Sequence, residues 1–126
     1  MGSVRPRPLI LDAGGLIAFE RFDRRVVRLL ELADELHVPA GVVGQVWRNP
    51  ARQVRLVRLL ATDEVSVHEL DFETAKAAGH LCGATGTADV IDASVVLVAR
   101  GRQGVVLTSD AGDIRRIDPR LDLAEC

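Results

Sequence analysis

The sequence has few of the residues typical of secreted, membrane-spanning or base-stacking proteins. Its two cysteines, Cys82 and Cys126, are too few and too far apart for a disulfide framework, and there is no CxxC motif. No apolar run is long enough to span a membrane, and the N-terminal residues lack the apolar core of a signal peptide. We therefore expect a cytoplasmic protein with no membrane segment.

Aromatic residues make up only 3% of the chain, and tyrosine is absent. A surface that reads RNA by stacking bases on Phe and Tyr is therefore not expected. The net charge of −2 also argues against a general nucleic-acid coat protein. Lys76 is the only lysine, and the arginine bias suits a phosphate ligand or an acidic protein partner. Arginine-rich codon usage would produce the same bias without any structural cause.

The size and hydrophobic content fit one domain covering residues 1–126. Hydrophobic residues make up 48% of the chain, which is enough to build a buried core. Because aromatic residues are scarce, we expect this core to consist of Leu, Val, Ile and Ala.

Short apolar runs alternate along the chain with segments of helical periodicity. We expect strands at 9–11, 37–39, 65–68, 105–107 and 121–123, and helices at 26–33, 42–61 with a break at Pro50, 72–81 with Asp71 as N-cap, 88–100 and 114–117. This alternation predicts an α/β three-layer sandwich with a central parallel sheet.

Aspartates fall where such a sheet binds its ligands, at the carboxyl ends of the strands. Asp12 directly follows the first strand, and Asp110 follows the fourth. Asp89 and Asp92 lie three residues apart at the start of a helix, so both can project from one face of its first turn. Asp113 follows Asp110 by three residues. Three segments therefore deliver carboxylates to one edge of the sheet.

Each aspartate also has a structural interpretation as a helix cap. Taken singly, Asp89, Asp110 and Asp113 are best interpreted as caps. Asp12 stands beside three small residues, as a crowded site requires, and Asp92 lies within a strongly apolar helix. A buried carboxylate is costly unless a cation or a partner compensates it. These two positions favour a functional site.

Clustered carboxylates predict a site for Mg²⁺ or Mn²⁺, since these hard ions prefer oxygen ligands. Such a site can hydrolyse phosphodiesters. Other chemistries have less support, because the three histidines share no ligand spacing and there is no HExxH, Walker A or GxGxxG motif. No serine or cysteine has an evident activating partner.

Three segments resemble the acidic motifs of PIN-domain nucleases. Residues 9–18 are similar to the opening of that family, residues 87–93 to the helix that bears its third acid, and residues 107–114 to its last acidic motif. Their order and spacing resemble VapC-type toxins of type II toxin–antitoxin systems over nearly the whole chain. The resemblance implies a PIN-like fold, Mg²⁺-dependent endoribonuclease (hydrolase) activity, inhibition by a VapB-type antitoxin, and a homodimer.

The resemblance also implies a role for each acid. Asp12 and Asp92 would be the principal catalytic metal ligands, and Asp110 would complete the cluster through a second metal or bound waters. Asp89 and Asp113 would be supporting acids.

The chain departs from the family pattern at two positions. Gln45 stands where the family usually has its second acid, a glutamate. An amide oxygen can ligate a metal, but it can neither neutralise charge nor act as a base. Gly14 lacks a hydroxyl that the family often has there. Both departures bear on catalytic strength.

Four arginines lie beside the Gln45 motif at helical spacing, namely Arg48, Arg52, Arg55 and Arg58. They would contact RNA phosphates or an acidic antitoxin tail, and Arg48 and Arg52 are the first candidates. The alternative is the solvated face of an amphipathic helix.

Two functions from different classes follow. The first is an RNA-cutting toxin, which the intact Asp12, Asp92 and Asp110 favour. The second is a PIN-like protein-interaction module with weakened catalysis, which Gln45 favours. A phosphoacceptor receiver domain fits poorly, because the chain lacks an acidic pair on the first strand and a lysine after the last.

Overall fold

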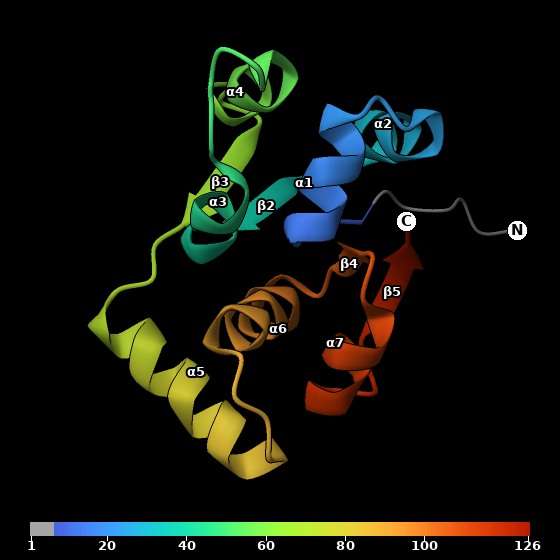
Figure 1. Ribbon diagram of the computed structural model, residues 1–126. Coiled ribbons are helices and arrows are strands. Elements are labelled where there is room, and N and C mark those ends of the chain that lie inside the picture. The colour runs from blue at the N-terminus through green and yellow to red at the C-terminus, as the bar shows by residue number, and fades with distance from the viewer. Residues whose placement is uncertain (1–6) are drawn as a thin grey trace, which may run out of the picture.

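Five parallel strands form the central sheet of the computed structural model, which describes residues 7–126 (Figure 1). They are β1 (Leu9–Leu11), β2 (Leu36–Pro39), β3 (Val65–His68), β4 (Val105–Thr108) and β5 (Asp122–Glu125), in the order β3-β2-β1-β4-β5. All five predicted strands are present. Residues 1–6 of the predicted domain lie outside the described part of the chain.

Helices cover both faces of the sheet, which confirms the predicted three-layer α/β sandwich (Figure 1). They are α1 (Ala13–Glu20), α2 (Arg24–Leu32), α3 (Ala40–Val46), α4 (Val54–Leu60), α5 (Phe72–Thr85), α6 (Val90–Arg102) and α7 (Ala111–Ile117). Helices α1, α2 and α4 lie on one side, and α5, α6 and α7 lie on the other. Helix α3 packs against both α1 and α6.

The core lies along both faces of the two central strands. All of β1 is buried, and so are Val106 and Leu107 on β4. Val95 and Val96 on α6 are buried with them. Because the central strands are covered on both sides, their sequences are continuous apolar runs rather than alternating patterns. Each such side chain contributes about 1.5–3 kcal/mol when it is fully buried.

Helix α1 was not predicted from the sequence. Its first turn contains Gly14 and Gly15, and glycine disfavours a helix by about 1 kcal/mol relative to alanine. The reason for the glycines is close packing against β4. A Cβ on Gly14 would lie 1.9 Å from Ser109 Oγ, and one on Gly15 would lie 2.9 Å from the Leu107 carbonyl oxygen. The glycine pair therefore brings the start of α1 directly onto the end of β4.

The helical pattern predicted over 42–61 is divided between α3 and α4, with the break near Pro50 as expected. The Arg48 guanidinium donates to the carbonyl oxygens of Gly44 and Trp47, and so satisfies the end of α3. The four arginines therefore do not share one helical face, because Arg48 and Arg52 lie in the intervening loop. That part of the prediction is wrong.

The remaining helices lie where the sequence indicates, with bounds that differ by a few residues. Asp71 caps α5 as predicted, since its side chain accepts from Thr74 N at 2.8 Å. Gly86, in the left-handed conformation with φ of 68°, ends α5. Within residues 7–126, no single helix is long and apolar enough to cross a membrane; α5 and α6 reach that length and composition only jointly, across a bend of 103°.

Candidate metal centre

The strand order reverses at β1, which places two acids at the same edge of the sheet. β2 lies on one side of β1 and β4 on the other, and Leu11 pairs with Leu107. Asp12 and Asp110 follow these two adjacent strands. Ligands of parallel sheets bind at such a reversal, outside the carboxyl ends of the strands. The sequence-based placement of these two acids is therefore consistent with the topology.

Asp12 is a buried carboxylate with no positively charged partner. Its residue is 7% exposed, and its Oδ1 accepts from Gly15 N at 3.0 Å at the start of α1. Burial raises the pKa of Asp12, hydrogen bonds from Thr108, Gly15 and Gly14 oppose that rise, and the charge of Asp110 adds to it. No Arg, Lys or His among residues 7–126 forms an ion pair with it. The described residues thus leave the charge of Asp12 without a cationic partner.

Thr108 links the acids of the two strands, and the sequence analysis missed it. It is fully buried at the end of β4, and its hydroxyl lowers the pKa of Asp12. The same hydroxyl oxygen accepts from Asp110 N at 2.9 Å. Thr108 therefore holds the backbone of Asp110 and favours the charged form of the Asp12 carboxyl. A threonine two residues before an aspartate is a known turn pattern, and could have suggested this role.

Asp89 and Asp92 begin α6 and have different roles. Asp89 is the N-cap, and its Oδ1 accepts from Ile91 N at 3.0 Å and Asp92 N at 2.9 Å. The cap interpretation of Asp89 is confirmed. Asp92 makes no cap bond and is half-buried. Burial, followed by the charges of Asp89, Asp113, Asp12 and Asp110, raises the pKa of Asp92 to about 6. All five acids therefore lie close enough to affect one another electrostatically.

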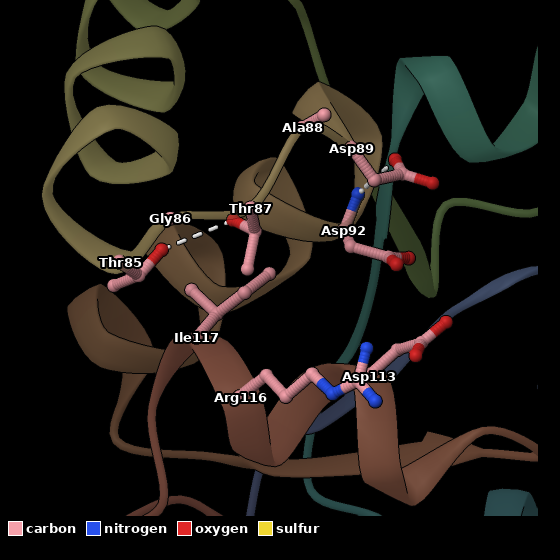
Figure 2. A pocket seen from close by; sticks show the side chains of 9 residues that line it. All are labelled: Thr85, Gly86, Thr87, Ala88, Asp89, Asp92, Asp113, Arg116 and Ile117. Atoms are coloured by element: carbon pink, nitrogen blue, oxygen red, sulfur yellow. Dashed lines mark hydrogen bonds between the residues drawn. The ribbon is translucent and has the colours of Figure 1, made fainter.

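Asp110 and Asp113 complete the group from α7. Asp110 occupies the N-cap position but makes no side-chain cap bond, so its interpretation as a cap is wrong. The neighbouring Asp110 carboxyl instead raises the pKa of Asp113, and the charge of Arg116 opposes the rise. Figure 2 shows the carboxylates of Asp89, Asp92 and Asp113 projecting toward the same side of a cavity of about 570 Å³.

The donor chemistry fits Mg²⁺ or Mn²⁺ better than a metal that needs a closed cage. Within the described chain, no group of three or more His, Cys, Asp or Glu side chains is arranged to hold a metal ion. A structural zinc site needs such a set. Mg²⁺ does not, because one or two carboxylates bind it and several waters remain. Asp12 and Asp92 are oxygen donors whose pKa values are raised first by burial and then by the charges of neighbouring acids. A divalent cation would compensate these negative charges.

Gln45 lies on α3, and its place in the site stays a prediction. It is exposed and makes no hydrogen bond to another described residue. One turn earlier, a Cβ on Gly41 would lie 3.0 Å from Ile91 Cγ1, so this face of α3 packs beside the start of α6. Residues four apart share a helix face. Gln45 is therefore on the side of α3 that faces the acids.

The arginines near Gln45 are not equivalent. Arg55 stacks over Phe22 at 4.2 Å and Phe19 at 4.9 Å, and so joins α4 to α1. Arg48 is bonded to the end of α3. Arg52 and Arg58 are exposed and form no ion pair within residues 7–126. Arg52 is therefore better placed than Arg48 to receive an external anion.

The fold and the acidic edge together define an α/β protein with a group of aspartates where its strand order reverses. Residues 9–119 match the family described as PIN domain. The chain belongs to the PIN-domain family. No curated protein matches its sequence.

Solved structures with the same fold include three proteins of low sequence identity. VapC20 of Mycobacterium tuberculosis, described as a sarcin-ricin loop cleaving toxin, has a TM-score of 0.66 and 14% identity, covering 82% of this chain and 95% of its own. VapBC2 of Rickettsia felis, bound to a promoter DNA fragment, has a TM-score of 0.60 and 13% identity, covering 94% and 98%. FitAcB of Neisseria gonorrhoeae has a TM-score of 0.60 and 17% identity, covering 91% and 95%. At these low sequence identities, the structural similarity shows only that the fold is shared.

Proposed function

We propose that this protein is a divalent-metal-dependent endoribonuclease and the toxin of a toxin–antitoxin pair. The observation that carries the proposal is the buried Asp12, which has no cationic partner among residues 7–126 and lies beside Asp92, whose pKa is raised to about 6. Membership of the PIN-domain family supports nuclease activity. The fold shared with VapC20, which is described as a sarcin-ricin loop cleaving toxin, supports RNA as the substrate.

The residues at this edge of the sheet would have different roles. Asp12 and Asp92 would hold Mg²⁺ or Mn²⁺, which supplies a nucleophilic hydroxide and stabilises the leaving oxygen. Thr108 keeps the Asp12 carboxylate in place, and the Asp89 cap bonds hold the first turn of α6 that carries Asp92. Asp110 and Asp113, at the start of α7, would orient waters or a second metal.

The partner we propose is a VapB-type antitoxin, with Arg52 among its contacts. Structural neighbours described as VapBC2 and FitAcB support a two-protein system. An acidic tail would pair with an exposed arginine through charge-assisted hydrogen bonds. A homodimer and a cytoplasmic location belong to the same proposal.

The proposal is tested by incubating total RNA with the purified protein in Mg²⁺, in Mn²⁺ and in EDTA. We expect cleavage with either metal and none in EDTA. Asp12→Ala and Asp92→Ala should each reduce cleavage by more than about a hundredfold, because even indirect partners of a metal ligand are worth 10–100-fold. Asp63→Ala is the matched control, since Asp63 is exposed between α4 and β3 and makes no hydrogen bond to the described residues. Full cleavage by a folded Asp92→Ala protein would contradict the site.

A second candidate function is a protein-interaction module with weakened catalysis. Gln45 favours it, because an amide there removes one charge that would hold the metal. A wild-type protein that binds an antitoxin but cleaves no RNA with either metal would establish this alternative.

A further inference from the structure

The cavity beside the acids contains a second set of polar groups that metal binding does not use. It is lined by Thr85, Gly86, Thr87 and Ala88 at the junction of α5 and α6, and by Arg116 and Ile117 on α7, in addition to the three acids (Figure 2). Its volume of about 570 Å³ is within the range of small-ligand pockets, about 300–1,000 Å³. The cavity therefore has room for a group larger than a hydrated metal.

Arg116 provides a free cation at this cavity. It is exposed on α7, and its side chain makes no hydrogen bond and no ion pair within the described residues. Its charge lowers the pKa of Asp113, one turn earlier, so the two side chains lie near each other. Figure 2 shows its side chain extending along the cavity beside Asp113. A guanidinium with all its donors free is suited to a phosphate group.

Thr87 offers a hydrogen-bond acceptor in the same cavity. The Thr85 hydroxyl donates its only proton to the Leu81 carbonyl oxygen at 2.8 Å. In the 3.0 Å contact between the two threonine hydroxyls, Thr87 must therefore be the donor. Its oxygen keeps lone pairs and has no proton left to donate. The group that it would bind is a donor, such as a hydroxyl, rather than a phosphate oxygen.

We propose that this cavity is a ribonucleotide subsite next to the metal centre. Arg116 binds the phosphate that neighbours the cleaved one, and Thr87 Oγ1 accepts a hydrogen bond from the 2′-hydroxyl of that nucleotide. A 2′-hydroxyl contact distinguishes RNA from DNA. The lining contains no aromatic ring, so the subsite holds the backbone and shows little base preference. This inference rests on the proposed nuclease function and names how its substrate is held.

The phosphate contact is tested by cleavage kinetics of Arg116→Gln on a single-stranded RNA oligonucleotide. We expect KM to rise about tenfold with kcat nearly unchanged, the signature of binding shared by substrate and transition state. Binding of the same oligonucleotide, measured by fluorescence anisotropy, should lose about 0.7 from the magnitude of its log–log salt slope. Arg115→Gln is the matched control, since Arg115 is the next residue and pairs with Glu125 at 3.9 Å.

The 2′-hydroxyl contact is tested with a series of RNA oligonucleotides, each carrying one 2′-deoxy substitution. For the wild type, a 2′-deoxy substitution at one position near the cleaved phosphate should raise KM several-fold. Thr87→Val should lose the response at that position, and Thr87→Ser, which keeps the hydroxyl, should restore it. Non-additivity of this kind identifies two groups in contact.

The outcomes separate the subsite from the proposed function. If the wild type cleaves RNA but Arg116→Gln has the KM and salt slope of the wild type, the proposed subsite is wrong. The proposed nuclease function would still be supported. If the wild type cleaves no RNA with either metal but binds RNA, and Arg116→Gln weakens that binding, the subsite is supported and the proposed nuclease function is wrong. If the wild type neither cleaves nor binds RNA, both are overturned. A response of Thr87→Val to the 2′-deoxy series equal to that of the wild type would overturn the 2′-hydroxyl contact.

Discussion

Two buried aspartates in this protein have opposite electrostatic environments. Asp12 is 7% exposed and Asp118 is 3% exposed. Asp118 accepts from Arg100 Nε at 2.8 Å, from Arg120 Nε at 3.2 Å and from Arg120 N at 3.0 Å. Burial alone would raise the pKa of Asp118, but these bonds lower it to about 2. Asp12 has no such cations within residues 7–126, and burial raises its pKa.

The difference shows how a structural carboxylate can be told from a functional one. Asp118 ties the end of α7 to Arg100 in the last turn of α6, and the protein supplies all the charge that it needs. Asp12 is held by uncharged donors only. A buried charge that its own protein leaves uncompensated favours binding of an external cation.

The largest effect on stability is expected at Asp118. Asp118→Asn removes a carboxylate bonded to two arginines, and should lower the free energy of unfolding by about 1–3 kcal/mol at pH 7. Because the native pKa of about 2 is below the ordinary value of 3.8, this contribution is present above pH 4 and is lost as pH falls toward 2. Urea denaturation of both proteins from pH 7 to pH 2.5 measures the difference.

The matched control for Asp118 is Asp122→Asn. Asp122 pairs with Arg7 at 2.6 Å, but both side chains are about half exposed, and such pairs contribute about 0–1 kcal/mol. Equal losses at positions 118 and 122 would contradict the structural role of Asp118.

Asp92→Asn should have the opposite and smaller effect. It removes one of five mutually repelling charges, so the melting temperature in EDTA should rise by a few degrees, while the shift produced by Mg²⁺ should decrease. In the wild type, that shift corresponds to about 2.7 kcal/mol at a Mg²⁺ concentration one hundred times Kd. Thermal melts of both proteins in EDTA and in Mg²⁺ measure the two quantities.

The pH dependence of the Asp92 effect has a defined sign. The native pKa of about 6 lies above 3.8, so the native state binds the proton more tightly than the unfolded chain. Charged Asp92 destabilises the fold fully above pH 6, and the penalty disappears as pH falls toward 4. The advantage of Asp92→Asn in EDTA should therefore be largest near pH 8 and absent near pH 4. If Asp92→Asn has a lower melting temperature than the wild type in EDTA and keeps the full increase produced by Mg²⁺, Asp92 is a structural residue.

The smallest effect is expected at Gln45. If this face of α3 reaches the metal, Gln45→Glu adds a carboxylate oxygen and should tighten Mn²⁺ binding several-fold. Calorimetric titration measures the affinity, with Gln103→Glu as control because Gln103 ends α6 at the opposite edge of the sheet. Unchanged affinity would place Gln45 outside the metal shell.

The sequence predicted the sheet and most of the acidic edge, because both depend on short-range patterns. Apolar runs marked the five strands, and parallel pairing then placed Asp12 and Asp110 at one edge. The N-cap roles of Asp71 and Asp89 also follow from local sequence.

The features that the sequence could not predict depend on contacts between distant segments. Helix α1 forms despite Gly14 and Gly15 because β4 requires their small size. Arg100, the partner of Asp118 on α6, is 18 residues away in the sequence. His37 and His68, which share no ligand spacing, are neighbours at 2.8 Å through the pairing of β2 with β3. None of these contacts leaves a periodic signal in one segment.

The most direct test of the account is a calorimetric Mn²⁺ titration of three folded proteins at pH 7.5: wild type, Asp12→Asn and Asp118→Asn. Both substitutions remove one charge from a buried aspartate. We predict that the wild type and Asp118→Asn bind Mn²⁺ with similar affinity, and that Asp12→Asn loses more than about tenfold. Equal affinity of the wild type and Asp12→Asn, or no binding by the wild type, would contradict the claim that the uncompensated Asp12 marks a metal centre.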